Sequence, residues 1–243
     1  MIRFFNLLFY IGCLGVILAS CGKRDSMKQP PLVYNPFVEA FTSGTISRCD
    51  PVYLIFSQEI PEDRVKADQI GKHMRIQPNV AGKWSVENNK TFVFRPEKEF
   101  DRNTSYKITA DLSKWFDTQK AEETFTFGFT TYPLALRGDL ESMEIHPRNE
   151  NGYDFSVAFF TPDKEKPETV ESLVDFSEKV NATWQHGPDG KKHALVLTNV
   201  PADQEGGREL RLFVPQNKEG VKEEELITIK VPGQNDFSIY DIT

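Results

Sequence analysis

The clearest pattern of hydrophobic and polar positions lies at residues 124–130, where threonine and phenylalanine alternate. Phe125, Phe127 and Phe129 are spaced two residues apart, so a β-strand places all three rings on one face. Three rings on one face have to be covered, whereas the intervening threonines can face water. The segment therefore predicts a strand with one face in a hydrophobic core.

Short apolar runs between turn residues predict further strands along the whole chain. Residues 52–56 are mostly apolar, which is typical of a strand covered on both faces. Residues 61–71 predict a short helix instead, with proline and acids in its first turn and a glycine at its end. Further strands are expected at 38–42, 74–77, 83–86, 91–95, 105–110, 136–145, 153–160, 182–186, 193–197, 209–214 and 226–231, with a short helical or bent segment at 168–173.

The density of these strands predicts an all-β fold with two tandem units that meet at Tyr132-Pro133. About seven strands in about 100 residues is the density of an immunoglobulin-like β-sandwich. A chain of 243 residues also suits two domains of common size. We expect one sandwich at residues 37–133 and a second at residues 134–232. Residues 233–243 then form a tail or the first strand of a further domain, and 237–242 offer an edge for strand exchange.

The N-terminal residues carry a different pattern, that of a secretion signal. Arg3 precedes an apolar run over residues 4–18, which leads through the small residues Ala19 and Ser20 to Cys21. This order resembles the lipobox of bacterial lipoproteins. A helix over the run would reach only about 22 Å, short of the roughly 30 Å of a bilayer core, which argues against a membrane span.

This pattern predicts the processing and attachment of the chain. We expect residues 1–20 to be removed as a signal peptide and Cys21 to be lipidated, so that the membrane is a partner through the lipid. Residues 21–36 are polar and rich in proline, which predicts an extended tether. The expected location is the bacterial cell envelope, at the outer membrane, on its periplasmic face or its surface.

Composition narrows the classes of partner and of chemistry. The formal net charge is −7 and no basic block occurs, so nucleic acid is not an expected partner. Three cysteines are present, of which Cys13 lies in the signal and Cys21 is the lipid site. Only Cys49 remains, so no disulfide is expected within the mature chain. We interpret Cys49 as a small residue at a strand end rather than as an activated thiol.

Two histidines flank a predicted turn and are the first candidates for a metal site. A two-residue turn within residues 187–190 would pair His186 with His193 across the strands. A type I turn at Pro188 would instead set His186 opposite Lys192 and place the two histidines on different faces, and the proline favours this second geometry. No third ligand is evident, so no metal site is predicted.

Other polar residues give no signal for catalysis. Asp163 and Glu165 lie in a loop rich in proline and lysine, so we expect solvated charges rather than a general acid and base. No nucleophile elbow, zinc-protease helix or phosphate-binding loop occurs. The sequence therefore predicts no catalytic residue and no cofactor, and it assigns no binding residue.

Ordered short motifs resemble known families. Residues 76–84, 91–96 and 104–106 resemble the bacterial immunoglobulin-like module of large surface proteins. Further motifs follow in an order that resembles the N-terminal region of bacterial alpha-2-macroglobulin lipoproteins, at residues 180–184, 186, 193, 199–201, 229–233 and 236–238. This family implies membrane-anchored proteins that trap proteases. Its Cys-Gly-Glu-Gln thioester segment does not occur in this chain.

Together these features lead to a first hypothesis of a non-enzymatic lipoprotein. It would act as a stalk and interaction module related to a macroglobulin-type protease inhibitor, with a protease or an envelope protein as partner. The alternative is a surface lipoprotein for glycan binding or adhesion, which predicts at least two exposed, coplanar aromatic rings, for example Trp115 and Phe116. Trp84 and Trp184 are expected to pack in or beside a core. The oligomeric state is left open.

Overall fold

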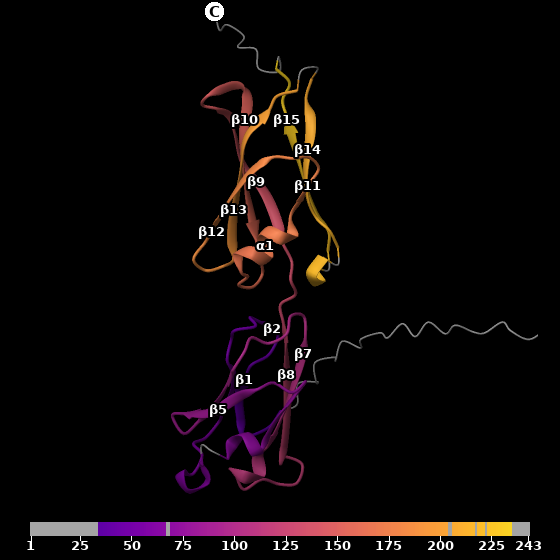
Figure 1. The fold of residues 1–243 in the computed structure, drawn as a ribbon. Coiled ribbons are helices and arrows are strands. Elements are labelled where there is room, and N and C mark those ends of the chain that lie inside the picture. Colours follow the sequence, from indigo (N-terminus) through magenta and orange to yellow (C-terminus); the bar gives the residue numbers. More distant parts are fainter. Residues whose placement is uncertain (1–33, 67–68, 204–205, 217, 222, 235–243) are drawn as a thin grey trace, which may run out of the picture.

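The computed structural model describes residues 34–234 except 67–68, 204–205, 217 and 222. Within these residues the chain forms fifteen strands and a single α-helix of seven residues, α1 (Pro167–Leu173), so the predicted all-β class is confirmed. Figure 1 shows two β units stacked end to end. The predicted signal peptide, Cys21, most of the predicted tether and residues 235–243 lie outside the described residues.

The first unit is built from two four-stranded sheets. One has the strand order β1-β3-β6-β5 and the other the order β2-β8-β7-β4. Neighbouring strands are antiparallel except for the parallel pair β2 and β8. The strands are β1 (Val38–Phe41), β2 (Thr45–Ile46), β3 (Val52–Phe56), β4 (Met74–Gln77), β5 (Gly82–Glu87), β6 (Thr91–Pro96), β7 (Ser105–Asp111) and β8 (Thr124–Thr131).

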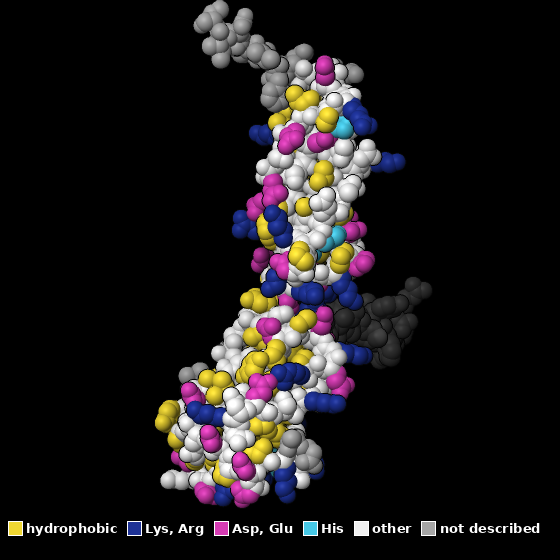
Figure 2. All heavy atoms as spheres, turned by 90° about the vertical axis from the view of Figure 1, so that its left-hand side faces the viewer, with side chains coloured by type: hydrophobic (Ala, Val, Ile, Leu, Met, Phe, Trp, Pro, Cys, Tyr) yellow, Lys and Arg dark blue, Asp and Glu magenta, His cyan; other side chains and the backbone are white. Residues whose placement is uncertain are grey.

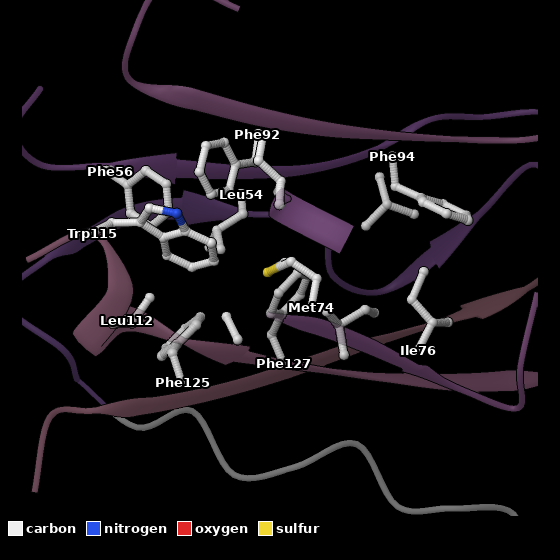
Figure 3. Packing of buried hydrophobic residues seen from close by; sticks show 14 of the residues in the cluster. Leu54, Phe56, Met74, Ile76, Phe92, Phe94, Leu112, Trp115, Phe125 and Phe127 are labelled. Carbon is white, nitrogen blue, oxygen red and sulfur yellow. The ribbon is translucent and has the colours of Figure 1, made fainter. Parts of the chain in front are cut away.

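The core of this unit contains the phenylalanines that the alternating pattern selected. Phe125, Phe127 and Phe129 are all buried, at most 3% exposed, as predicted for β8. Trp115 packs its ring against Phe92, with centroids 4.8 Å apart (Figure 3). Trp115 and its neighbour Phe116 are only 2% and 3% exposed, so the aromatic platform expected of a glycan-binding protein is absent at these two residues.

Two details of the first unit differ from the sequence prediction. The helix expected at 61–71 is wrong, because the chain forms two short 3₁₀ turns, η1 (Glu62–Arg64) and η2 (Ile70–Lys72). Val65 is extended, which ends the first turn, and the buried Ile70 draws the second toward the core. Strand β3 is fully covered on one face only, since its alternate residues are half-buried.

The second unit has a four-stranded and a three-stranded sheet. Their strand orders are β12-β13-β10-β9 and β11-β14-β15, with antiparallel neighbours throughout. All six strands expected in this part of the chain are present, and α1 replaces the segment expected to be helical or bent. The strands are β9 (Arg137–His146), β10 (Asn149–Phe160), β11 (Asp175–Phe176), β12 (Asn181–His186), β13 (Lys192–Pro201), β14 (Arg208–Val214) and β15 (Glu225–Val231).

The two units have separate hydrophobic cores and a short connection. The buried cluster of the first unit ends at Phe129 and that of the second begins at Leu134. The backbone N–H of Tyr132 still donates to the carbonyl of Ile46 in the first unit. Only Pro133 therefore lies between the last backbone bond of one unit and the first core residue of the next, which leaves little slack for reorientation.

Candidate functional site

The most deeply buried charges lie where the two units meet. Asp163, in the loop after β10, accepts hydrogen bonds from the Ser47 hydroxyl at 2.6 Å and from the backbone N–H of Arg48 at 2.8 Å. Asp163 is 2% exposed and Glu165 is 5% exposed. The prediction that these two acids are solvated loop charges is therefore wrong, because their partners come from the other unit.

Glu165 lies between two guanidinium groups of the first unit. Arg48 reaches its carboxylate at 3.4 Å, and Arg102 contacts it with both Nε and Nη2. Arg48 also forms an ion pair with Glu99 at 2.9 Å. Each buried carboxylate is thus already engaged by cations or N–H groups, which fits a role in fixing the joint better than a role as a general acid or base.

Hydrogen bonding keeps Asp163 ionised. Burial alone would raise the pKa of its carboxyl group, but the hydrogen bonds from Arg48, Ser47 and the backbone N–H of Lys164 outweigh burial and lower the pKa below its usual value. The carboxylate is therefore charged at neutral pH and holds its partners in place.

The two candidate histidines face each other across neighbouring strands. His186 pairs with His193, and their Nδ1 atoms are 2.8 Å apart. The prediction that they lie on different faces is wrong, although its turn is present: the N–H of Gly190 donates to the carbonyl of Gly187. Lys191 adds one residue after this turn and thereby restores the register that pairs the histidines.

The histidine pair continues to a partly exposed acid at one end and is buried at the other. Nε2 of His186 lies 2.9 Å from Glu171 on α1, while His193 is fully buried. Burial, and next the charge of His186, lower the pKa of His193. No group of three or more potential metal ligands occurs among the described residues. Nε2 of His193 is buried and cannot reach a substrate, so this histidine serves the packing of the unit.

The free cysteine shows no sign of activation. The thiol of Cys49 is exposed and contacts the carboxylate of Glu99 at 3.6 Å. Partial burial, and then the charge of Glu99, raise the pKa of Cys49, and Arg48 offsets this only in part. A raised pKa disfavours the thiolate, as expected for a residue that is not an activated thiol, although Cys49 lies in the turn between β2 and β3 rather than at a strand end.

The remaining candidate is β9, the edge strand of the four-stranded sheet. Leu140, Met143 and Ile145 on this strand are 45%, 40% and 57% exposed. Their partners on β10 are the core residues Val157, Phe155 and Tyr153. Because directly paired residues project to the same face of a sheet, the three exposed side chains of β9 face the core side and remain uncovered.

The opposite sheet is too narrow to cover the whole of β9. It has only three strands, and β15 meets β9 near Gly138. A Cβ atom on Gly138 would lie 2.1 Å from Ile227 Cδ1, so the glycine allows this close approach. The carboxylate of Glu225 also accepts the backbone N–H of Gly138 at 3.1 Å. Beyond this point no strand of the opposite sheet, among the described residues, covers the apolar side chains of β9, which stay 40–57% exposed (Figure 2 shows hydrophobic side chains open to solvent on this unit).

Irregular pairing and acidic side chains limit the open edge. The register shifts between Ser156 and Val157, which leaves Glu141 as the extra residue of a β-bulge. Glu141 forms an ion pair with Lys192 at 3.0 Å. Glu144 lies opposite Asp154, and none of the ion pairs among the described residues involves Glu144. The strand was predicted, but its exposed edge was not, because cover depends on the width of the other sheet.

The comparisons with known proteins find similarity only to solved structures. No family model and no curated protein matches the chain. L,D-transpeptidase 3 from Mycobacterium tuberculosis is 13% identical, with a TM-score of 0.30, over 81% of this chain and 76% of that chain. Another L,D-transpeptidase from Mycobacterium tuberculosis H37Rv is 14% identical, with a TM-score of 0.29, over 68% and 77% of the two chains. One from Mycobacterium smegmatis is 12% identical, with a TM-score of 0.30, over 66% and 75%.

These findings correct the resemblance drawn from the short motifs. The similar structures given above are named as L,D-transpeptidases and not as macroglobulins, and neither a family model nor a curated protein supports the macroglobulin and protease-inhibitor assignment, which is therefore wrong. The prediction of a non-enzymatic stalk is wrong for the same reason, since the similar structures are named as enzymes. At this identity and TM-score the similarity transfers no activity to the chain. Among the described residues, no helix is long and apolar enough to cross a membrane.

Proposed function

We propose that this chain binds a protein partner at the open edge of β9 and is held at an envelope membrane through a lipid on Cys21. In this proposal residues 37–133 and 134–232 are two immunoglobulin-like sandwiches that follow a cleaved signal peptide and a proline-rich tether. The outer membrane is the proposed site of attachment.

One observation carries the binding proposal. Leu140, Met143 and Ile145 face the side of the sheet that is buried elsewhere, yet each stays at least 40% exposed. Fully burying one such side chain contributes about 1.5–3 kcal/mol, so covering the remaining surface of all three is a substantial driving force for association. Soluble proteins rarely leave adjoining apolar side chains on an edge strand without cover.

The binding proposal is tested by photo-crosslinking in the native host. A photoreactive residue at Ser142, in the middle of the open edge, is compared with one at Leu226, an exposed apolar position on β15. We expect a protein crosslink at position 142 that maps to one segment of the partner and is lost with Met143→Asp. Equal crosslinking at the two positions, or a crosslink that Met143→Asp leaves unchanged, would refute the proposal.

The anchor is supported by the order of charge, apolar run, small residues and cysteine at the N-terminus. Two or more acyl chains on one cysteine give stable attachment, since each buried CH₂ contributes about 0.8 kcal/mol. Labelling with radioactive palmitate should mark the chain, and Cys21→Ser should abolish the label and release the chain from membranes. Cys49→Ser is the matched control and should retain the label. Unlabelled wild-type chain would contradict the anchor.

A further inference from the structure

We infer that the segment bound at β9 is a short extended stretch of another protein that alternates apolar with basic residues and joins the sheet as its fifth strand. This inference rests on the proposed function, because it names the partner chemistry of the same edge. Edge strands present unpaired N–H and C=O groups, which an extended segment can pair while its side chains select the site.

The regular part of the edge sets the length of the segment. At one end Glu225 already accepts the N–H of Gly138, and the bulge at Glu141 interrupts the ladder next to it. The uninterrupted pairing with β10 runs from Ser142 to Ile145. Four residues at about 3.3 Å each correspond to roughly 13 Å, so the paired core of the bound segment is about four residues long.

The apolar positions of the segment follow from the inner face of β9. Met143 and Ile145 point to the core side of the sheet and are 40% and 57% exposed. Every second side chain of an added strand would lie beside these two and cover them. Branched apolar residues suit such positions, because they pack well on a pleated surface.

The basic position follows from the opposite face. Glu144 is exposed between Met143 and Ile145 in sequence, and it lies opposite Asp154 on β10. Asp154 is engaged by His146 at 3.0 Å and by the N–H of Asn199 at 2.7 Å, whereas Glu144 makes no ion pair with any described residue. A lysine or arginine next to Glu144 would relieve the repulsion between the two acids.

Charge disfavours two occupants that this chain itself could supply, a second copy of β9 and the C-terminal tail. A second copy of β9 would bring Asp139, Glu141 and Glu144 to the edge with a single arginine, Arg137, which already contacts Asp139 at 3.5 Å. The tail at 233–243 contains Asp236 and Asp241 and no lysine or arginine. Both would place acids beside Glu144, so the observed charges favour a basic segment of another protein over either of these two.

The first test uses a fluorescent ten-residue peptide of alternating valine and lysine, titrated with the purified full chain and followed by fluorescence anisotropy. We expect the double variant Met143→Thr, Ile145→Thr to weaken binding about tenfold or more, because the apolar contact is lost. Leu226→Thr, which also removes an exposed apolar side chain, should leave binding within about twofold. Equal weakening by both variants would overturn the inference.

The second test reverses the charge on the edge. We expect Glu144→Lys to weaken the binding of the valine–lysine peptide by about threefold to tenfold. The same variant should strengthen the binding of an alternating valine–glutamate peptide. Glu97→Lys changes the net charge equally at an exposed site of the first unit and should alter neither affinity by more than about twofold. Equal effects of the two reversals would show general charge attraction only and would overturn the inference.

Further measurements separate this inference from the proposed function. Amide chemical shifts of residues 142–145 should move most on addition of the valine–lysine peptide, and shifts confined to other residues would refute strand addition at this edge. Concentration-dependent dimerisation that Ile145→Thr abolishes would identify a second copy as the occupant. If the photo-crosslink at position 142 persists while Glu144→Lys has no effect on it or on the peptides, the proposed function stands and the basic segment is wrong.

Discussion

The backbone N–H of Arg48 donates to the carboxylate of Asp163 at 2.8 Å, although 115 positions separate the two residues in the sequence. This bond joins the turn after β2 to the loop after β10, and the side chain of Arg48 continues to Glu165. A backbone bond to a buried acid fixes position as well as charge, so the joint between the units is part of the folded structure rather than a flexible hinge.

Removal of Arg48 should therefore destabilise the protein strongly. Arg48→Ala leaves Asp163 and Glu165 buried with fewer partners, and we expect a loss of about 3 kcal/mol in the free energy of unfolding, measured in urea. Arg95→Ala breaks an exposed pair with Glu87 and should cost far less, because solvent screens a pair at the surface. Similar losses for the two variants would show that the contacts of Arg48 at the joint stabilise the protein no more than an exposed ion pair does.

Acid should weaken the joint through Asp163. Its pKa is lowered in the folded protein, so its contribution is fully present above the usual carboxyl pKa of about 4. That contribution is lost as the pH falls through the lowered pKa. The free energy of unfolding, measured in urea between pH 7 and pH 3, should fall more steeply with decreasing pH for the wild type than for Asp163→Asn. Asp117→Asn, at an acid whose side chain is 91% exposed, should keep the wild-type slope.

A second pH dependence should come from His193. Its pKa is lowered in the folded protein, so the unfolded chain binds the proton more readily. Stability is then complete above the usual histidine pKa of about 6.5 and declines as the pH falls from there toward the lowered value. His193→Gln should reduce the change of the urea unfolding midpoint between pH 7.5 and pH 5, whereas His73→Gln should leave that change as it is in the wild type. An unchanged slope in His193→Gln would rule out this source.

Close packing at the start of β9 predicts a strong effect of one methyl group. Gly138→Ala places a Cβ atom 2.1 Å from Ile227 and 2.7 Å from the ring of Phe159, so we expect a loss of about 1–3 kcal/mol in unfolding free energy. At Gly71 the nearest atom would be 3.7 Å away, and Gly71→Ala should change stability by less than about 0.5 kcal/mol. Thermal unfolding by circular dichroism distinguishes the two variants.

Local patterns predicted the strands because the signal for a strand lies within the strand. The alternation at Phe125, Phe127 and Phe129 reports the buried face of β8 directly. The turn after His186 was also readable from Pro188, since proline and glycine fix a backbone geometry. These inferences use neighbours in sequence and need no knowledge of the tertiary structure.

The joint and the open edge could not be predicted in this way. Asp163 looks solvated beside its lysine and proline neighbours, and only the approach of Arg48 from the other unit buries it. The histidine register depended on the single residue Lys191. The exposure of Ile145 depends on how many strands the opposite sheet contains, which no residue of β9 encodes.

The contact of Glu225 with Gly138 makes the open edge asymmetric. At the Gly138 end of β9, the carboxylate of Glu225 already accepts the backbone N–H that a bound segment would otherwise pair with. At the other end, next to the β9–β10 hairpin, β15 makes no such contact with the edge. A bound segment therefore has to leave the edge before it reaches Gly138, so its contact with the sheet ends at the bulge while the hairpin end stays open to it.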